Sequence, residues 1–294
     1  MRYTLRQLEV FIATAQHENI SRAASDLAMS QSAASGSLRE LEQQFNVQLF
    51  DRLGKRLRLS ELGRQLRPAA EELLDRARAL EQGMLGEEIS GRLQLGATLT
   101  IGNYLAVPMI AAFRTRFPAA DVALSVANTA AIAEKVAHYE LDIGLVEGEL
   151  SHADLSCEPW QADELTVFAA PGHPLARRRA LTDDDLLSLE WIVREPGSGT
   201  RQTFDRAMHG ILPALRLALE LQHTEAIKRA VEAGLGVGCL SRISLVEAFA
   251  RGSLVPLRVP HRDFTRRLHI VLHRQKFHTA ALREWLTLCH EQPW

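Results

Sequence analysis

The first 45 residues carry apolar positions at helical spacing in three short segments. The first segment begins near Thr4 and predicts a helix whose inner face carries Leu5, Leu8, Phe11, Ile12 and Ala15. A second helix is predicted over residues 22–28, with Ser21 as its N-cap, and a third over residues 31–45. The third helix is expected to turn inward Ala34, Leu38, Leu41 and Phe45. Met29-Ser30 is a tight turn, so the second and third helices must approach each other closely. The small residues that allow this approach are Ala23, Ala24, Ala33 and Ala34.

Residues 47–59 alternate apolar and basic positions around Gly54. This pattern predicts two short strands joined by a turn, that is, a hairpin wing next to the three helices. Its tip carries Arg52, Lys55 and Arg56, and Arg58 lies on the returning strand.

One long helical pattern follows, from Ser60 to about Glu88. Its continuous apolar stripe consists of Leu62, Leu66, Ala69, Leu73, Leu74, Ala77, Leu80 and Leu85. No neighbouring segment of the sequence covers that stripe, so the pattern predicts a helix that packs against a second copy of the chain.

From about Gly91 onward, short apolar runs alternate with helical stretches. The predicted strands are 93–97, 122–126, 143–146, 165–169, 191–193, 217–221, 237–240 and 268–272. The predicted helices are 104–117, 129–139, 200–208, 225–233, 244–250 and 280–289. This alternation predicts an α/β domain with largely parallel sheets.

Composition narrows the class of protein. The chain has 294 residues, 46% hydrophobic and 24% charged, which fits a folded protein of two units. We see no secretory signal and no apolar run long enough to span a bilayer, and therefore expect a cytoplasmic protein. The three cysteines, Cys157, Cys239 and Cys289, are far apart in the sequence and lack the spacing of a metal site. We therefore expect no disulfide framework, no metal site and no cofactor.

The second and third helices have the order and spacing of a helix-turn-helix. In that motif the N-terminal residues of the second helix reach base edges in the major groove, which here are Gln31, Ser32, Ser35 and Ser37. Ser21 suits a phosphate contact at a helix start, and the basic wing supplies further phosphate or minor-groove contacts through Arg52, Lys55 and Arg56. The alternative is a simple packing module with a solvated hairpin.

Several motifs resemble LysR-type transcriptional regulators. They are the runs 5–11 (LRQLEVF), 21–24 (SRAA), 27–35 (LAMSQSAAS), 49–52 (LFDR), 60–63 (SELG), 93–97 (LQLGA), 141–145 (LDIGL) and 232–238 (EAGLGVG). Many members carry a long polar residue after the Ser of the recognition helix, whereas this chain has Gly36. A glycine there weakens the helix by about 1 kcal/mol.

The resemblance implies two α/β lobes, similar to those of periplasmic binding proteins, with a ligand in the cleft between them. The expected division is a winged helix-turn-helix over 1–59, a linker helix over 60–89 and an effector-binding domain over 90–294. Lobe 1 would comprise about 90–162 and 266–294, and lobe 2 about 163–265.

The sequence also supports a cleft directly. Two loops that follow a strand and open a helix are rich in glycine and hydroxyl side chains, and such helix starts favour anions. The candidate residues are Thr98, Thr100, Asn103, Ser198, Gly199, Thr200 and Arg201, with Asn128 and Glu147 as weaker candidates. The alternative is that these are ordinary turns of an α/β protein.

The run 197–201 (GSGTR) looks most like that of LysR-type regulators of sulfur assimilation and carbon fixation. This likeness points to sulfite, sulfate or another small oxyanion, or to a phosphorylated metabolite, as effector. We therefore expect a regulator that binds double-stranded promoter DNA as a homodimer or homotetramer. The alternatives are a small-anion binding protein of the transport type and an anion-processing enzyme, and no nucleophile–base pair or metal set favours the enzyme.

Overall fold

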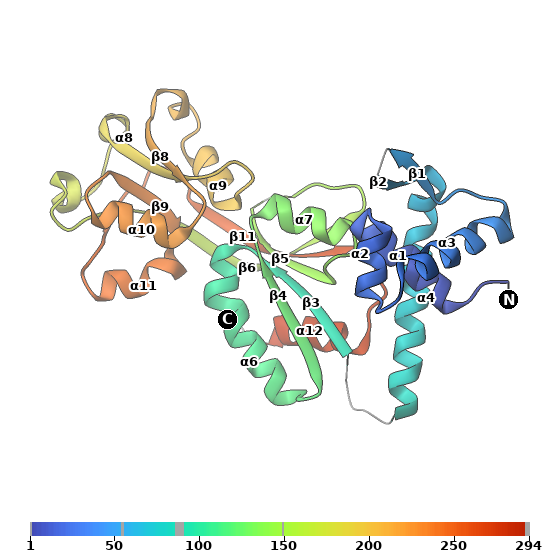
Figure 1. Cartoon of the computed structure of the whole chain (residues 1–294). Helices are drawn as coiled ribbons and strands as arrows, with labels where there is room; N and C mark the ends of the chain where they lie inside the picture. The colour runs from blue at the N-terminus through green and yellow to red at the C-terminus, as the bar shows by residue number, and fades with distance from the viewer. Residues whose placement is uncertain (1, 54–55, 86–90, 149, 292–294) are drawn as a thin grey trace.

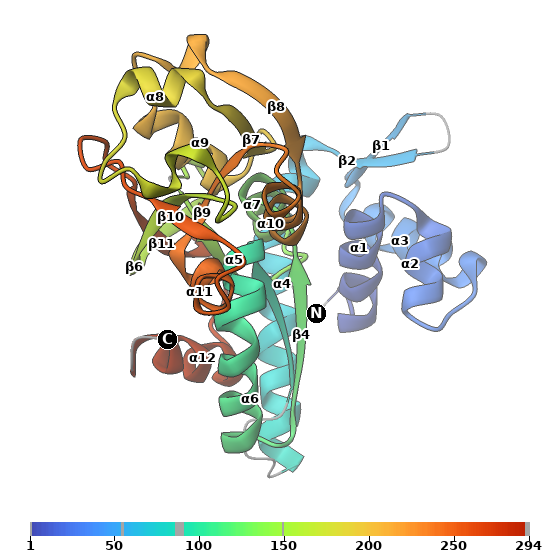
Figure 2. The same ribbon diagram turned by 90° about the vertical axis from the view of Figure 1, so that its left-hand side faces the viewer.

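A computed structural model describes residues 2–53, 56–85, 91–148 and 150–291. It contains a small helical unit, a long helix and a larger α/β domain (Figure 1). The helical unit consists of α1 (Leu5–His17), α2 (Ile20–Asp26), α3 (Gln31–Phe45), β1 (Phe50–Leu53) and β2 (Arg56–Leu59). Seen after a 90° turn, the helical unit and its hairpin project to one side of the α/β domain (Figure 2).

The helical unit agrees with the sequence except at the start of α2 and at three side chains. Leu5, predicted on the inner face of the first helix, is 47% exposed, and Ala33, predicted where the two helices approach closely, is exposed as well. Helix α2 begins at Ile20 rather than Arg22, because Asn19 is its N-cap and accepts the N–H groups of Ser21 and Arg22 at 2.9 and 3.1 Å. Ser21 therefore lies in the first turn and is not the cap. Phe45 is 44% exposed rather than inward, and its ring packs on Tyr3 at the edge of the unit.

The long helix α4 (Glu61–Leu85) has two different faces. Part of the apolar stripe is open in the single chain, since Leu66 is 44% and Leu80 62% exposed, and the neighbouring Met84 is 77% exposed. The helical unit covers another part of it, contrary to the prediction, because Leu74 is buried and Leu62 and Leu73 are partly buried in its core. The other face buries the charged residues Arg67 and Glu71, together with Asp75, against the α/β domain. Sequence periodicity predicted the apolar stripe but not this buried charged face.

The α/β domain has two lobes built on one continuous sheet with the strand order β4-β3-β5-β11-β6-β9-β7-β8. In lobe 1, β3 (Gly91–Ala97) pairs in parallel with its two neighbours, β4 (Ala120–Val126) and β5 (Ile143–Glu147). Its helices are α5 (Leu99–Ile101), a π-helical turn (Gly102–Ala106), α6 (Val107–Arg116), α7 (Thr129–Ala137) and α12 (Ala280–Glu291).

Lobe 2 repeats this plan around β7 (Glu190–Arg194), which pairs in parallel with β8 (Arg216–Leu221) and β9 (Val237–Ser241). Its other elements are α8 (Asp183–Ser188), α9 (Gly199–Ala207), α10 (Thr224–Glu232), α11 (Arg242–Ala250), β10 (Val255–Leu257) and 3-10 turns at Pro174–Arg177 and Leu212–Ala214. Each lobe has its own aromatic core contact, Phe113–Trp285 in lobe 1 and Trp191–Phe204 in lobe 2.

Two long strands, β6 (Leu155–Ala169) and β11 (Thr265–His273), run through both lobes and pair antiparallel. The sequence predicted only residues 165–169 and 268–272 of these strands, together with a largely parallel sheet, and so missed both the crossing and its direction. The reason is that polar residues, among them Glu158, Asp163 and Glu164, interrupt the apolar pattern of β6. The two-lobed α/β architecture itself is confirmed.

Candidate DNA-binding surface and effector cleft

The start of α3 is an open polar surface. The Ser30 hydroxyl caps the helix by accepting the N–H of Ala33 at 3.2 Å. Gln31 and Ser32 are exposed directly after the cap, whereas Ser35 and Ser37 are half-buried. No atom lies within 4 Å of a Cβ built on Gly36, so this part of the helix surface is bare.

The other predicted DNA contacts belong to α2 and to the hairpin. Ser21 is exposed in the first turn of α2. Arg52 and Arg56 belong to β1 and β2 of the hairpin, and Arg58 is exposed on β2. Lys55 lies outside the described residues. The hairpin is the wing that the sequence predicted.

In the α/β domain, a buried carboxylate lies where the two lobes meet. Glu147 ends β5 of lobe 1 and is 1% exposed. Its Oε1 accepts the backbone N–H of Thr100 at 3.1 Å, and its Oε2 accepts the hydroxyl of Thr200 at 2.8 Å. Both threonines are at the start of a helix, one in each lobe, so the two predicted loops meet on a single anionic group.

The counter-charge of this group is Arg266, which the sequence did not single out. Its Nη1 donates to Glu147 Oε2 at 2.9 Å and to the Thr200 hydroxyl at 3.1 Å. Its Nε donates to Asp163 Oδ2 at 2.7 Å, and Asp163 also accepts the Ser241 hydroxyl at 2.8 Å. A signal was present, because alternation along the strand places Arg266 on the same face as Leu268 and Ile270, and a charged residue on an inward face needs a buried partner.

Burial alone would raise the pKa of Glu147. The Arg266 guanidinium and the hydrogen bonds from Thr100 and Thr200 lower this pKa instead, to about 2. Glu147 is therefore ionised at neutral pH, and Arg266 faces two carboxylates, those of Glu147 and Asp163.

The remaining candidates differ in position. Asn128 caps α7 and reaches across the lobes to Glu195, with Nδ2 3.3 Å from Oε1. A Cβ on Gly199 would lie 2.0 Å from the carbonyl oxygen of Glu147, so a glycine there lets the lobes touch. Ser198 caps α9, and Asn103 is exposed in the π-helical turn.

Arg201 is held within lobe 2. Its Nε lies 2.9 Å from Asp205, and its Nη1 lies 3.0 Å from Glu220 and from the carbonyl oxygen of Arg194. The positive charge at the Glu147 carboxylate therefore comes from Arg266 rather than from Arg201.

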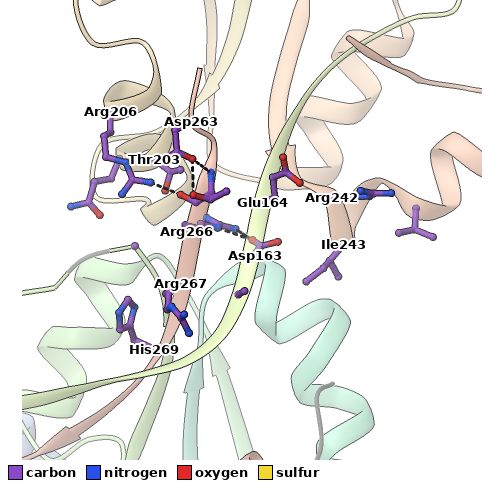
Figure 3. Close-up of a pocket in the computed structure, with 15 residues that line it drawn as sticks. Asp163, Glu164, Thr203, Arg206, Arg242, Ile243, Asp263, Arg266, Arg267 and His269 are labelled. Atoms are coloured by element: carbon purple, nitrogen blue, oxygen red, sulfur yellow. Dashed lines mark hydrogen bonds and ion pairs between the residues drawn. The ribbon is translucent and has the colours of Figure 1, made fainter. Parts of the chain in front are cut away.

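An open cavity of about 1050 Å³ adjoins Arg266. Figure 3 shows Arg266 directed at Asp163, with Arg206, Arg242 and Arg267 around it on three different elements. The cavity lies next to the cleft, because Gly148 and Thr203 also line it.

Three other kinds of feature could indicate a function for the described residues: disulfides, metal clusters and membrane-spanning helices. The three cysteines are free, with Cys239 and Cys289 buried and Cys157 half-buried. Among the described side chains, no group of three His, Cys, Asp or Glu residues could hold a metal ion. No helix in the described part of the chain is long and apolar enough to cross a membrane.

Two family models match the chain. Residues 5–64 match the bacterial regulatory helix-turn-helix of the LysR family, and residues 86–294 match the LysR substrate binding domain. The chain belongs to the LysR family of transcriptional regulators. It is thus a DNA-binding regulator with an effector-binding domain, as the sequence motifs indicated.

Relatives of this LysR-family regulator agree with the subgroup indicated by residues 197–201. It is 43% identical to the HTH-type transcriptional regulator YeiE of Escherichia coli, over 98% of both chains. It is 32% identical to the RuBisCO operon transcriptional regulator of Allochromatium vinosum, over 94% of this chain and 92% of the relative. It is 29% identical to CysL of Bacillus subtilis, over 90% of this chain and 89% of the relative.

Solved structures share the fold of this LysR-family chain. A full-length OxyR variant of Pseudomonas aeruginosa matches 98% of this chain and 94% of its own, with a TM-score of 0.76 at 22% identity. The regulatory domain of Synechocystis CcmR in complex with 2-PG matches 68% of this chain and 96% of its own, with a TM-score of 0.63 at 30% identity.

Proposed function

We propose that the cleft senses a small oxyanion, such as sulfite or sulfate, or a phosphorylated metabolite. The observation that carries this proposal is the Glu147 carboxylate, which accepts hydrogen bonds from Thr100, Thr200 and Arg266. An oxyanion needs the same donors. Since Arg266 already faces two carboxylates, we expect the effector to displace Glu147 rather than bind beside it.

Three further observations support an anion at this place. The Thr98 hydroxyl, at the end of β3, is buried without a hydrogen-bond partner in the described part of the chain. Arginines outnumber carboxylates in the adjoining cavity, where Arg206, Arg242, Arg266 and Arg267 lie among Asp163, Glu164 and Asp263, and this small excess of positive charge favours the approach of an anion. The CcmR domain in complex with 2-PG is a relative with a small-molecule ligand.

The test is thermal unfolding of the full-length protein with sulfite, sulfate, thiosulfate, O-acetylserine and phosphorylated sugars. A ligand that binds the folded state raises the melting temperature. We expect Thr200→Val to abolish the rise, because the donor is the side-chain hydroxyl. Thr100→Ala is the matched control and should keep most of the rise, because its donor is the backbone N–H.

Glu147→Gln separates two kinds of effector. A simple oxyanion should bind this variant about tenfold more tightly, since the internal carboxylate no longer competes for Arg266. A zwitterion such as O-acetylserine should bind it less tightly, because its ammonium group loses a carboxylate partner. No response to any compound in either protein would remove the basis of the anion proposal.

For DNA, we propose that α3 enters the major groove and that the wing contacts phosphates or the minor groove. The proposed contact residues are Ser21, Gln31, Ser32, Ser35, Ser37, Arg52, Lys55 and Arg56. The exposed start of α3 and the bare surface at Gly36 support this proposal.

We also propose that the protein acts in the cytoplasm as a homodimer or homotetramer without enzymatic activity, with the domain boundaries expected from the sequence. Support for the dimer is the exposed stripe on α4, including Leu66, Leu80 and Met84. Leu80→Glu should lower the assembled mass in sedimentation equilibrium, whereas Glu81→Gln, at the exposed neighbouring position, should not.

A further inference from the structure

Two paired strands connect the effector cleft with the long helix. Strand β5 ends at Glu147 in the cleft and begins directly after Asp142. Strand β11 runs antiparallel to β5, from Arg266 in the cleft toward Lys276 beyond its other end. A buried ion pair closes each end of this strand pair, since Glu147 lies 2.9 Å from Arg266 and Asp142 lies 2.8 Å from Lys276.

The pair at the far end also holds the helix α4. Lys276 Nζ lies 2.9 Å from Asp75 Oδ2 on α4, and the Lys276 side chain is only 7% exposed. Asp142 is fixed in turn because its Oδ2 accepts the backbone N–H of Gln94 in β3 at 2.7 Å. Burial would lower the pKa of the Lys276 ammonium, but Asp142 and Asp75 raise it above its ordinary value. Lys276 is thus charged and bridges lobe 1 and the helix.

Another contact between α4 and lobe 1 lies beside this bridge. Arg67 donates to the carbonyl oxygen of His138 and lies over the ring of Tyr139. These lobe 1 residues follow α7 and belong to neither strand. Tyr139 is nevertheless linked to the end of β11, because its hydroxyl lies 2.7 Å from His273 Nδ1, and Arg76 of α4 lies over the ring of Phe277 next to Lys276. Of the contacts described for α4, the Asp75–Lys276 ion pair is the one that also reaches the start of β5, through Asp142.

Strand β5 is suited to move as a unit. All five of its residues are buried, and it is bonded to β3 on one side and to β11 on the other. A Cβ on Gly144 would lie 2.8 Å from Ile132 of α7, so the covering helix packs directly on the strand backbone. Five residues of strand span about 17 Å, and close-packed interiors transmit displacement instead of absorbing it.

We propose that Lys276 is a positioning residue through which the state of the cleft sets the attachment of α4 to lobe 1. When Glu147 leaves Thr100 and Arg266, β5 and β11 shift together. Asp142 and Lys276 move with them, and the Asp75 contact weakens. The regulatory meaning of this coupling rests on the proposed anion effector, but the coupling itself is a property of the strands and needs no ligand.

The test uses hydrogen exchange on the full-length protein with Asp75→Ala. This variant removes the ion pair between α4 and lobe 1 but leaves Lys276 its second partner, Asp142, so lobe 1 keeps its own ion pair. Because coupling between two sites is reciprocal, we expect exchange in the segment 98–101, which contains the Thr100 N–H, to be about tenfold faster. Glu61→Ala is the matched control, because Glu61 is an exposed carboxylate that pairs with Arg64 in the first turn of α4, and it should leave this segment unchanged.

The reciprocal experiment starts from the cleft. Glu147→Gln removes the charge at the other end of β5, and we expect about tenfold faster exchange in residues 67–79 of α4. If Asp75→Ala accelerates exchange only in α4 and in residues 138–142, the two ends are independent and the proposal is wrong. Failure of every anion to bind, with the Asp75→Ala effect at the cleft still present, would overturn the effector proposal and leave the coupling standing.

Discussion

Gln31 and Ser32 at the start of α3 are exposed, whereas Thr100 and Thr200, also at helix starts, are each 2% exposed. Helix starts leave N–H groups without partners inside the helix. Water satisfies such groups on an open surface, so the start of α3 remains available to DNA. In the cleft, the carboxylate of Glu147 takes the place of water, because it accepts the Thr100 N–H and the Thr200 hydroxyl. A buried anion site is thus recognised by the internal group that fills it.

The largest expected effect comes from removing the cation of the cleft. Arg266→Met leaves Glu147 and Asp163 buried without their counter-charge, and breaking a buried pair in this way costs about 3–5 kcal/mol. The free energy of unfolding, measured in urea, should fall by that amount. Arg267→Met is the matched control because Arg267 is the next residue on the same strand and is exposed. It should change stability by less than about 0.5 kcal/mol, and equal losses in both variants would contradict the role of Arg266.

Glu71 on α4 is a second buried carboxylate, but it lacks the close hydrogen-bond donors that Glu147 has. Burial raises the pKa of Glu71 on α4 to about 7, and the nearest cation, Arg67, is 3.7 Å away. A carboxyl whose folded pKa exceeds its unfolded value, 4.5, stabilises the protein below pH 4.5 and loses that contribution as the pH rises to about 7. As the pH rises from 4.5 to 7, the free energy of unfolding of Glu71→Gln should therefore increase relative to that of the wild type by up to about 3 kcal/mol.

Urea unfolding at several pH values checks this prediction. Glu72→Gln is the matched control one residue along the helix, where the side chain is 41% exposed, and its stability should follow the wild-type pH curve. Parallel curves for wild type and Glu71→Gln would show that Glu71 is ionised throughout this range.

Glu147 should show the opposite pH dependence. Its folded pKa of about 2 lies below the ordinary value of 4.5, so its contribution is present above pH 4.5 and is lost as the pH falls toward 2. The stability difference between wild type and Glu147→Gln should shrink by about 1 kcal/mol on going from pH 4.5 to pH 3.5. A difference independent of pH would mean that Thr100, Thr200 and Arg266 do not hold an ionised carboxylate.

The two regions also differ in how far the sequence predicted them. Apolar spacing located α3 over its full length, and the alternation of apolar and basic residues over 47–59 predicted the wing, because local patterns determine both. In the cleft, the sequence located Thr100 and Thr200 but named Arg201, and not Arg266, as the basic residue. Arg266 is 66 residues away from Thr200 along the chain, and only the crossing of β6 and β11 brings them together. The buried charges of α4 were missed for the same reason, because the lobe that covers them is distant in sequence.

A smaller effect is expected at the DNA-reading surface. Gln31→Ala should lower discrimination between a selected DNA site and a variant site by about 1 kcal/mol, because an amide side chain can bond two atoms of one base. Lys55→Ala should weaken binding to every sequence and flatten the salt dependence. Titration of fluorescent DNA, selected from a random library, measures both variants. If Gln31→Ala weakened all sites equally, Gln31 would contact phosphate instead of a base.

The smallest expected effect concerns Gly36, in the middle of α3. A glycine inside a helix costs about 0.5–1 kcal/mol relative to alanine, and a Cβ at this position meets no atom within 4 Å. Gly36→Ala should therefore raise the free energy of unfolding by that amount, and Gly83→Ala, at a position equally free of neighbours, provides the matched control on α4. Every other position on the exposed part of α3 carries a side chain that DNA would have to accommodate. The DNA affinity of Gly36→Ala therefore tests whether DNA approaches the helix at this position. Stabilisation with unchanged affinity would show that the bare surface is not used, whereas stabilisation with weaker binding would show that the helix backbone itself approaches DNA at Gly36.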